Sequence, residues 1–309
     1  MNCFRSQILA AALVAASTFV QPAASAAEKP VIEAEIPRGG DFVGFGFDAL
    51  WMMSGSKLVR VNPADNSLTI TPVEGASGSY RGVAIGEHTV WVPDVIAGRI
   101  HGFDPKTGTE TMHCDVAMSD KEGTIAEYAN SLWVVTTSNG GKTMARIGVD
   151  GCKLESEIQL PANGKSVVAA YGSIWVTGYI ANALFRIDPA SNAIVQTTPL
   201  GQRPRFATSG EDSVWVLNQG DGTVQRIDGH SGLVTATIEA GLDGGGGDIA
   251  SGGGSVWIVT GTRTLAKVDP ETNTIVNRLD VTGMGDALRY GADSVWISGE
   301  NIYRLKPPN

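Results

Sequence analysis

Histidine and cysteine are scarce in this chain of 309 residues, which contains four histidines and three cysteines. The histidines form no His-x-x-His pair, no cysteine has a histidine placed to activate it, and no serine occupies a nucleophile elbow. These absences exclude the common zinc-hydrolase motifs and the hydrolases that use a serine or cysteine nucleophile. The sequence therefore identifies no catalytic residue.

Basic residues are also in the minority. The chain has 23 Lys and Arg against 32 Asp and Glu, which gives a formal net charge of −9. A net acidic surface repels phosphate groups, so we expect neither nucleic acid nor an anionic membrane surface as a partner.

Long apolar runs are absent after the first 26 residues. Within that segment, Arg5 precedes an apolar stretch at 8–20, and Ala24-Ser25-Ala26 resembles a cleavage site. This pattern predicts a signal peptide over residues 1–26, since the apolar stretch is shorter than the roughly 20 residues that span a bilayer. We expect residues 27–309 to form one periplasmic or secreted domain that does not insert into a membrane and is a monomer.

Helical periodicity is absent as well, and a different period replaces it. Successive tryptophans are 39 to 42 residues apart, and each lies in a similar apolar run such as SIWVT or SVWVL. The seven are Trp51, Trp91, Trp133, Trp175, Trp215, Trp257 and Trp296. A fixed period of this length indicates a repeat architecture.

One repeat shows what each unit contains. Residues 206–209, 213–217, 223–227 and 233–239 alternate or are β-branched, and turn-forming Gly, Asn and Asp separate them. Four short antiparallel strands per repeat, repeated seven times, predict an all-β, seven-bladed β-propeller with almost no helix. The last repeat has three strands, ending at 301–305, and a lone strand at 31–36 precedes the first. We expect that N-terminal strand to close the last blade.

Residues that recur in every repeat are interpreted as scaffold. The third strand carries a basic residue in six repeats, namely Arg60, Arg146, Arg186, Arg226, Lys267 and Arg304. Such regularity favours a structural contact with a turn of the neighbouring blade over a cationic ring for a polyanion. The tryptophans are expected to pack between blades.

Residues that break the pattern at the channel mouth are the candidates for function. The position ten residues before each tryptophan marks the start of an innermost strand and holds Asp41, Arg81, Gly123, Lys165, Arg205, Gly247 and Asp286. The ligand-binding candidates at this mouth are Tyr80, Arg81, Lys165, Tyr179, Arg205, Asp248 and Asp286. Two readings stay open: the cations bind a small anionic or zwitterionic ligand, or the charges pair with one another across the channel.

Two mouth loops are unusual. Residues 136–143 form the longest loop between a second and a third strand, and residues 242–248 form a glycine run. Consecutive glycines can present backbone N–H groups to an anion, although such a run can also be a simple connection. A metal site for Mg²⁺ or Ca²⁺ built from Asp41, Asp248 and Asp286 is a further possibility, because these ions take oxygen ligands.

Two cysteines remain after the predicted leader, Cys114 and Cys152. An even count in an oxidising compartment favours a disulfide. The repeat register argues against it, because the two positions differ by about six residues along the outer strands, or roughly 20 Å. A disulfide needs Cα atoms within about 7 Å.

The repeat, seen best in SIWVTGYIANALFRIDPASNAIVQTTPL, resembles the YVTN-type β-propeller repeat over all seven units. It is also similar to the virginiamycin B lyase family. That resemblance implies a seven-bladed propeller and a lyase that opens a cyclic depsipeptide by elimination, with a histidine base and a magnesium ion held by glutamates at the mouth. This chain departs from the pattern, because the positions that correspond to the histidine and acidic residues of the lyase include only one acidic residue and no histidine. They are Ser54, Asp94, Thr136, Gly178, Asn218, Thr260 and Gly299.

Two functions from different classes follow. The first is a binding or scaffold protein that recognises a small anionic ligand, a peptide or a partner protein at the channel mouth. The alternative is a metal-assisted lyase or hydrolase, in which Asp94, Asp248 and Asp286 would hold the metal. No motif for an organic cofactor is evident.

Overall fold

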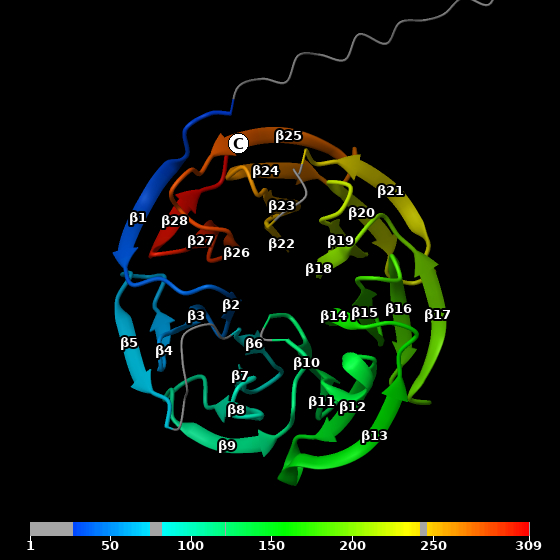
Figure 1. Cartoon of the computed structure of the whole chain (residues 1–309). Coiled ribbons are helices and arrows are strands. Elements are labelled where there is room, and N and C mark those ends of the chain that lie inside the picture. The colour runs from blue at the N-terminus through cyan, green and yellow to red at the C-terminus, as the bar shows by residue number, and fades with distance from the viewer. Residues whose placement is uncertain (1–26, 75–81, 121, 242–245, 309) are drawn as a thin grey trace, which may run out of the picture.

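The computed structural model describes residues 27–74, 82–120, 122–241 and 246–308. It confirms the predicted fold: seven four-stranded antiparallel sheets are arranged radially around a central channel (Figure 1). In the described part of the chain, helix is limited to two three-residue 3-10 turns, η1 and η2. The predicted strands of the example repeat appear as four strands with nearly the predicted bounds.

The first four blades follow one another along the chain. Blade 1 contains β2 (Val43–Gly46), β3 (Ala49–Ser54), β4 (Lys57–Val61) and β5 (Leu68–Pro72). Blade 2 contains β6 (Ala84–Ile85), β7 (Val90–Asp94), β8 (Arg99–Phe103) and β9 (Glu110–Asp115). Blade 3 contains β10 (Ile125–Tyr128), β11 (Ser131–Thr136), η1 (Ser138–Gly140), β12 (Thr143–Gly148), η2 (Asp150–Cys152) and β13 (Lys153–Gln159). Blade 4 contains β14 (Gly164–Ala170), β15 (Ser173–Gly178), β16 (Ala183–Asp188) and β17 (Ala193–Pro199).

The remaining blades complete the ring. Blade 5 contains β18 (Pro204–Gly210), β19 (Ser213–Asn218), β20 (Thr223–Asp228) and β21 (Val234–Glu239). Blade 6 contains β22 (Asp248–Gly252), β23 (Ser255–Val259), β24 (Thr264–Asp269) and β25 (Thr274–Asp280). Blade 7 contains β26 (Ala287–Gly291), β27 (Ser294–Ser298), β28 (Asn301–Lys306) and the N-terminal strand β1 (Val31–Pro37).

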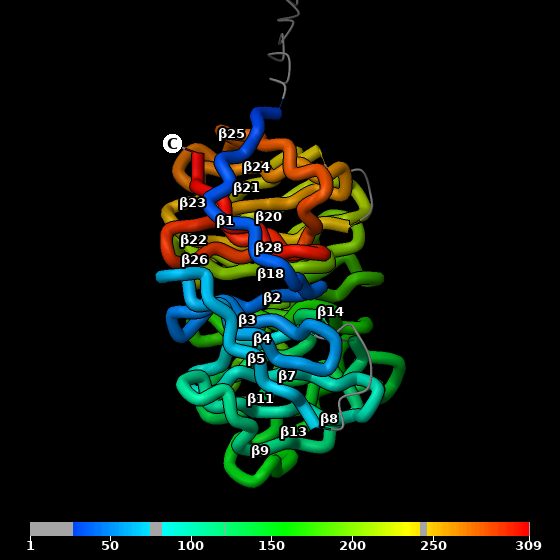
Figure 2. The backbone as a smooth tube through the Cα atoms, turned by 90° about the vertical axis from the view of Figure 1, so that its left-hand side faces the viewer, coloured from blue at the N-terminus to red at the C-terminus, as the bar shows by residue number. Residues whose placement is uncertain are grey.

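The ring closes through blade 7, as the lone N-terminal strand predicts. Strand β1 pairs antiparallel with β28, so that the two ends of the described chain share one sheet (Figures 1 and 2). Ahead of β1, Glu28 exchanges backbone hydrogen bonds with Arg278 and Asp280 of blade 6. The N-terminal segment therefore connects blades 6 and 7 at the circumference.

The seven tryptophans are almost completely buried, as expected of scaffold residues. Six of them lie opposite a basic residue of the third strand in the sheet register, as Trp215 does opposite Arg226. The guanidinium or ammonium group stacks over the indole ring, at 5.0 to 5.7 Å from the ring centroid. A partly exposed cation over an indole contributes about 1 kcal/mol, so each pair stabilises its blade.

Five of these six cations also bind the next blade, which confirms the structural interpretation of those five; Arg60 stacks on Trp51 and makes no such bond within the described residues. Arg226 Nη1 donates to the carbonyl of Pro270 and to Asn273 Oδ1 in the outer turn of blade 6. Equivalent bonds to a carbonyl group of the following blade are made by Arg146, Arg186, Lys267 and Arg304. Lys267 Nζ donates to the carbonyl of Pro308, which follows β28 at the C-terminal end.

The boundary between blades 2 and 3 is built differently. Trp91 lies opposite Gly102, where a Cβ atom would come within 2.8 Å of the indole ring, so no arginine fits. The indole N–H of Trp91 donates to Glu127 Oε2 of blade 3 at 2.6 Å, whereas the other six indoles donate to a carbonyl within their own blade. Gly86 permits this contact, because a Cβ atom on any other residue at this position would collide with the Glu127 carboxylate.

A disulfide joins Cys114 of β9 to Cys152 of η2 at this same boundary, with Cα atoms 5.2 Å apart. The argument against the bond from repeat register was therefore wrong. It assumed that outer strands of adjacent blades lie side by side, whereas they follow one another head to tail around the circumference (Figure 1). The end of β9 thus meets the start of β13, and an offset along the strands brings the two cysteines together.

No helix in the described ranges is both long enough and apolar enough to cross a membrane. The predicted leader, residues 1–26, lies outside the described residues.

The contacts of Arg226 predict a measurable cost of removing it. Arg226→Ala should lower the free energy of unfolding by about 2 kcal/mol, because it removes the bonds to blade 6 and the stacking on Trp215. Arg226→Lys should lose about half as much, since a lysine keeps the charge but not the fork of donors. Urea denaturation measures both, with exposed Lys106→Ala as a control that should stay within about 0.5 kcal/mol. A neutral Arg226→Ala would contradict the role assigned to these cations.

The disulfide between blades 2 and 3 should contribute substantially to the free energy of unfolding. Replacing Cys114 and Cys152 together by serine should lower the free energy of unfolding by about 4 kcal/mol, as the loop-closure relation gives for a loop of 38 residues. Dithiothreitol should destabilise the unsubstituted protein by the same amount and leave the double variant unchanged. Equal denaturation curves with and without the reductant would show that the bond does not form.

Candidate functional site

The innermost strands of the seven blades surround the central channel (Figure 1). A cavity of about 380 Å³ lies inside it, lined largely by small and aliphatic residues such as Val83, Ile125 and Val167. A second cavity of about 300 Å³ lies at the mouth predicted from the sequence, where Asp41, Arg205, Gly247 and Asp286 are among its lining residues. The mouth cavity and the inner cavity form the candidate site.

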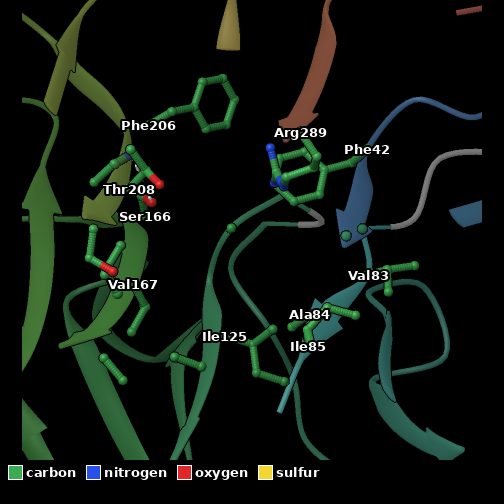
Figure 3. A pocket seen from close by; sticks show the side chains of 18 of the residues that line it. Phe42, Val83, Ala84, Ile85, Ile125, Ser166, Val167, Phe206, Thr208 and Arg289 are labelled. Atoms are coloured by element: carbon green, nitrogen blue, oxygen red, sulfur yellow. Dashed lines mark hydrogen bonds between the residues drawn. The ribbon is translucent and has the colours of Figure 1, made fainter. Parts of the chain in front are cut away.

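Two phenylalanines separate these cavities. Phe42 precedes β2 and Phe206 lies in β18, and their ring centroids are 6.1 Å apart across the channel (Figure 3). Both residues line both cavities. We call this pair the throat. It gives the mouth an aromatic floor, against which an apolar group of a ligand can be buried.

Arginines stack on both throat rings. The guanidinium group of Arg289 lies 4.5 Å from the centroid of Phe42, and that of Arg205 lies 4.8 Å from the centroid of Phe206. The throat therefore contains two cation–π pairs, and Figure 3 shows Arg289 against Phe42. Each pair holds its ring in place.

Asp248 fixes Arg289. Its carboxylate accepts hydrogen bonds from Arg289 Nη1 at 2.8 Å, from the backbone N–H of Leu288 at 2.9 Å and from the backbone N–H of the next residue, Ile249. Asp248 is only 4% exposed, and burial raises its pKa above the ordinary value, although the Arg289 charge and these hydrogen bonds oppose that shift. Asp248 is thus a positioning residue for the throat.

The charges at the rim are paired with one another. Lys165 Nζ and Arg205 Nη1 both contact Asp120 Oδ2, at 2.7 and 3.1 Å, and Arg205 Nη2 contacts Glu122 at 3.2 Å. On the other side, Arg263 pairs with Asp286 at 2.8 Å. Of the two readings of this rim, the described residues support the paired arrangement. A small anion would have to compete with Asp120 and Glu122 for its donors.

Other sequence candidates take different positions. Tyr80 and Arg81 lie outside the described residues. Tyr179 follows β15 and is half-buried, but it lines neither cavity. The mouth is also lined by Gln219, a residue outside that set, whose Nε2 donates to the carbonyl of Gly246. Asp94 is buried at the end of β7 and accepts a hydrogen bond from the N–H of Ala97.

Sequence reasoning missed the throat residues Phe42, Phe206 and Arg289, and also Asp120. A signal for the first two was present one position further along each repeat. Nine residues before each tryptophan the chain has Phe42, Gly82, Thr124, Ser166, Phe206, Asp248 and Ala287. Only blades 1 and 5 carry an aromatic residue there, which marks those two positions as departures from the repeat.

In the described part of the mouth, the donors that a magnesium-dependent lyase would need do not lie together. No group of three or more His, Cys, Asp and Glu side chains suited to hold a metal occurs among the described residues. Asp248 and Asp286 are each paired with an arginine. The four histidines line neither cavity. The described residues of the mouth therefore do not fit the metal that the resemblance implies.

Glu127 lines the inner cavity and is the acceptor for Trp91. Burial raises the pKa of Glu127, while the hydrogen bond from the indole acts in the opposite direction. The carboxyl therefore combines two roles: it connects blades 2 and 3, and it places a titratable group inside the channel.

Comparisons with known proteins agree with this fold. No protein-family model matches the chain, and no curated protein matches it by sequence. Virginiamycin B lyase from Staphylococcus aureus, in selenomethionine-substituted form, superposes with a TM-score of 0.74 at 19% identity and covers 89% of this chain and 99% of its own.

Two further solved structures are similar. A chain of the mitotic checkpoint complex gives a TM-score of 0.76 at 9% identity, covering 99% of this chain and 100% of its own. The β-propeller domain of Cps50 (Swd1) from Myceliophteria thermophila gives 0.73 at 11% identity, covering 90% and 100%. At such identities the likeness shows the seven-bladed fold alone, which a lyase shares with a chain of a multiprotein complex.

The raised pKa of Glu127 predicts how stability depends on pH. The folded protein keeps this proton to a higher pH than the unfolded chain, so unfolding releases it and stability falls as pH rises from about 4.3 through the folded pKa. Glu127→Gln retains an acceptor for Trp91 but has no proton to lose. Its melting temperature relative to the unsubstituted protein should therefore rise with pH and then level off.

Two further variants test the assignment. Glu127→Ala leaves the Trp91 N–H without an acceptor and should cost about 1–3 kcal/mol at every pH. Exposed Glu157→Gln on β13 should produce no comparable pH-dependent difference. Parallel curves for Glu127→Gln and the unsubstituted protein between pH 4 and 8 would contradict the raised pKa.

Proposed function

We propose that this protein is a periplasmic or secreted binding protein whose channel mouth takes a small peptide and buries one of its apolar side chains against the throat. The observation that carries the proposal is the Phe42–Phe206 pair at the floor of an open cavity of about 300 Å³. Burying one large apolar side chain contributes about 1.5–3 kcal/mol, and contact between aromatic rings adds about 0.5–1.5 kcal/mol.

The paired rim favours a peptide over a small inorganic anion. The side chains of Arg205 and Asp120 are only 14% and 16% exposed, so separating them would leave charges in a poorly solvated place. A zwitterionic or neutral ligand can contact the rim through its own amide groups and leave the pairs intact.

The predicted leader at residues 1–26 supports the proposed compartment. A disulfide between two blades is compatible with the periplasm or the cell exterior, where such bonds persist. The predicted ligand-binding role of Tyr80 and Arg81 stays a prediction, since neither residue belongs to the described part of the mouth.

A lyase related to virginiamycin B lyase is the second candidate, because that enzyme shares the fold over 89% of this chain. The described residues include no group of three or more His, Cys, Asp and Glu side chains that could hold a metal, and this counts against a metal-dependent lyase. Incubation with virginiamycin B and magnesium, followed by mass spectrometry, distinguishes the two functions. Opening of the ring that a chelator prevents would make this protein an enzyme and overturn the proposal.

The proposal predicts that affinity depends on the throat. Isothermal titration with a panel of short peptides should find the tightest binding for those with an aromatic or large aliphatic residue. Phe42→Leu and Phe206→Leu should each weaken the best peptide about tenfold, because they remove ring contacts worth about 1.4 kcal/mol. Phe47→Leu, in the hairpin between β2 and β3, is the matched control and should leave affinity unchanged.

Three results would count against this assignment. They are the absence of binding by any peptide, equal affinity of the throat variants and the unsubstituted protein, and tighter binding of phosphate than of every peptide. The last would favour the anion-binding reading of the rim.

A further inference from the structure

The inner cavity of about 380 Å³ differs from the mouth in the chemistry of its walls. Val83, Ile125 and Val167 give it aliphatic sides, and Phe42 and Phe206 close the end that faces the mouth (Figure 3). Cavities of this size that are largely apolar and contain few polar groups are typical sites for small organic molecules. The inner cavity is therefore a candidate ligand site in its own right.

Solvent reaches the inner cavity at the end away from the throat. The residues that line this end are partly exposed, and they are Phe45, Ile85, Ala169 and Ser209. They lie in innermost strands, close to the hairpins that lead into the second strands, and these hairpins are on the face opposite the mouth. A small molecule therefore has a route into the inner cavity that does not pass the throat.

Arg289 breaks the repeat pattern in the wall of this cavity. Seven residues before each tryptophan, the chain has Gly44, Ala84, Ala126, Val168, Thr208, Ala250 and Arg289. The first six side chains are small and uncharged, whereas the seventh is long and cationic. Figure 3 shows the guanidinium group of Arg289 beside Phe42, with its nitrogens directed toward the open space on the side of Phe206. One blade thus presents a cation where the others keep the channel neutral.

Two of the three nitrogens of this guanidinium group are available to a ligand. Nη1 is used within the protein, because it donates to Asp248 Oδ2 at 2.8 Å and to the carbonyl of Leu288. Nε and Nη2 donate to no described residue, and neither is among the polar atoms that are closed to solvent. The side chain is 22% exposed and lines the inner cavity. Its free N–H groups are therefore accessible from that cavity.

The charges in the inner cavity disfavour an ionic ligand of either sign. An anion bound to Arg289 would lie close to the Asp248 carboxylate, and it would share the cavity with Glu127. A cation would share the same cavity with the Arg289 guanidinium group. A neutral carbonyl oxygen accepts the free N–H groups without adding a charge, and hydrogen bonds from a charged donor are stronger than those from a neutral one.

The guanidinium group is also held in position before any ligand binds. It lies 4.5 Å from the centroid of Phe42, and its bond to Asp248 ends on a carboxylate that is almost completely buried. A donor that is already oriented loses little conformational entropy when it binds an acceptor. Arg289 therefore provides a fixed polar point in a cavity whose other walls are mainly apolar.

We infer that the inner cavity is a second ligand site, separate from the peptide site at the mouth. It takes a small, uncharged, apolar molecule with a carbonyl oxygen, and Arg289 binds that oxygen through Nε or Nη2. The aliphatic walls bury the body of the molecule, while the guanidinium group orients it. This site goes beyond the proposed function and does not depend on it, because the ligand enters from the opposite face.

The test is a fluorine NMR titration of the full chain with four probes of similar size. The ketone is para-fluoroacetophenone, and para-fluoro-α-methylstyrene replaces its oxygen by a CH₂ group of nearly the same shape. The anionic and cationic probes are para-fluorobenzoate and para-fluorobenzylammonium. The ketone should bind about tenfold more tightly than the styrene, because it gains a hydrogen bond from a charged donor, and more tightly than either ion.

Two variants identify the donor. Arg289→Met alone would leave Asp248 buried without its partner, so the test uses Asp248→Asn together with Arg289→Met, which removes both charges. This double variant should lose the preference for the ketone and keep its affinity for the styrene. Arg99→Met is the matched control, because Arg99 also pairs with a carboxylate, at 2.9 Å, but lines neither cavity. It should leave all four affinities unchanged.

The unsubstituted protein shows where the probe binds. The ketone should shift the methyl resonances of Ile125 and Val167 in the inner cavity, and it should leave those of Leu154, which is exposed on β13, unchanged. Equal affinity for the ketone and the styrene, tighter binding of either ion, or methyl shifts confined to other parts of the protein would each overturn the inference. None of these outcomes requires a variant to fold, and none bears on the peptide site, which the throat variants test separately.

Discussion

The ring depends on an interaction that recurs at five of its seven blade boundaries, in which a third-strand cation contacts the tryptophan of its own blade and a carbonyl group of the next. A four-stranded sheet buries one face against each neighbour, and apolar packing alone sets no rotation between blades. The cation fixes that rotation, because its N–H donors must reach carbonyl groups at a defined place on the following blade. Arg226, which bonds to Pro270 and Asn273, shows the complete arrangement.

The boundary between blades 2 and 3 shows what happens where this interaction is lost. The acceptor position that Asn192 occupies in the turn of blade 4 corresponds to Cys152 in blade 3, and both residues have a left-handed φ near +55°. Where Gly102 removes the cation, the cysteine at the acceptor position forms a covalent bond to Cys114 instead. Glu127 accepts a hydrogen bond from the Trp91 indole, which has no guanidinium group above it. Three departures from the repeat, at Cys114, Cys152 and Glu127, therefore compensate for the missing cation.

The sequence alone predicted the repeated part of this protein well, because each blade supplies independent evidence for the same strands and turns. It predicted the closing strand and the inter-blade role of Arg146 and its equivalents for the same reason. It failed for Cys114 and Cys152, where the relative direction of outer strands in adjacent blades was needed. Local register contains no information on that direction.

The sequence directed attention to the charged residues at the channel mouth and did not indicate the aromatic pair beneath them. Charged residues at the starts of the innermost strands were recognised, and the structure places Arg205, Asp248 and Asp286 at the mouth cavity. Whether Lys165 and Arg205 are available to a ligand depends on Asp120 and Glu122, which belong to a connection between blades that the repeat does not fix. Phe42 and Phe206 come from blades 1 and 5, so only the closed ring brings their rings within 6.1 Å.

These arrangements determine what can be selected at the mouth. A charge of a ligand adds little where Lys165, Arg205 and Arg263 already have carboxylate partners, because each new ion pair replaces an existing one. Apolar burial at the throat carries no such exchange cost. A mouth of this kind favours amphipathic molecules over simple ions.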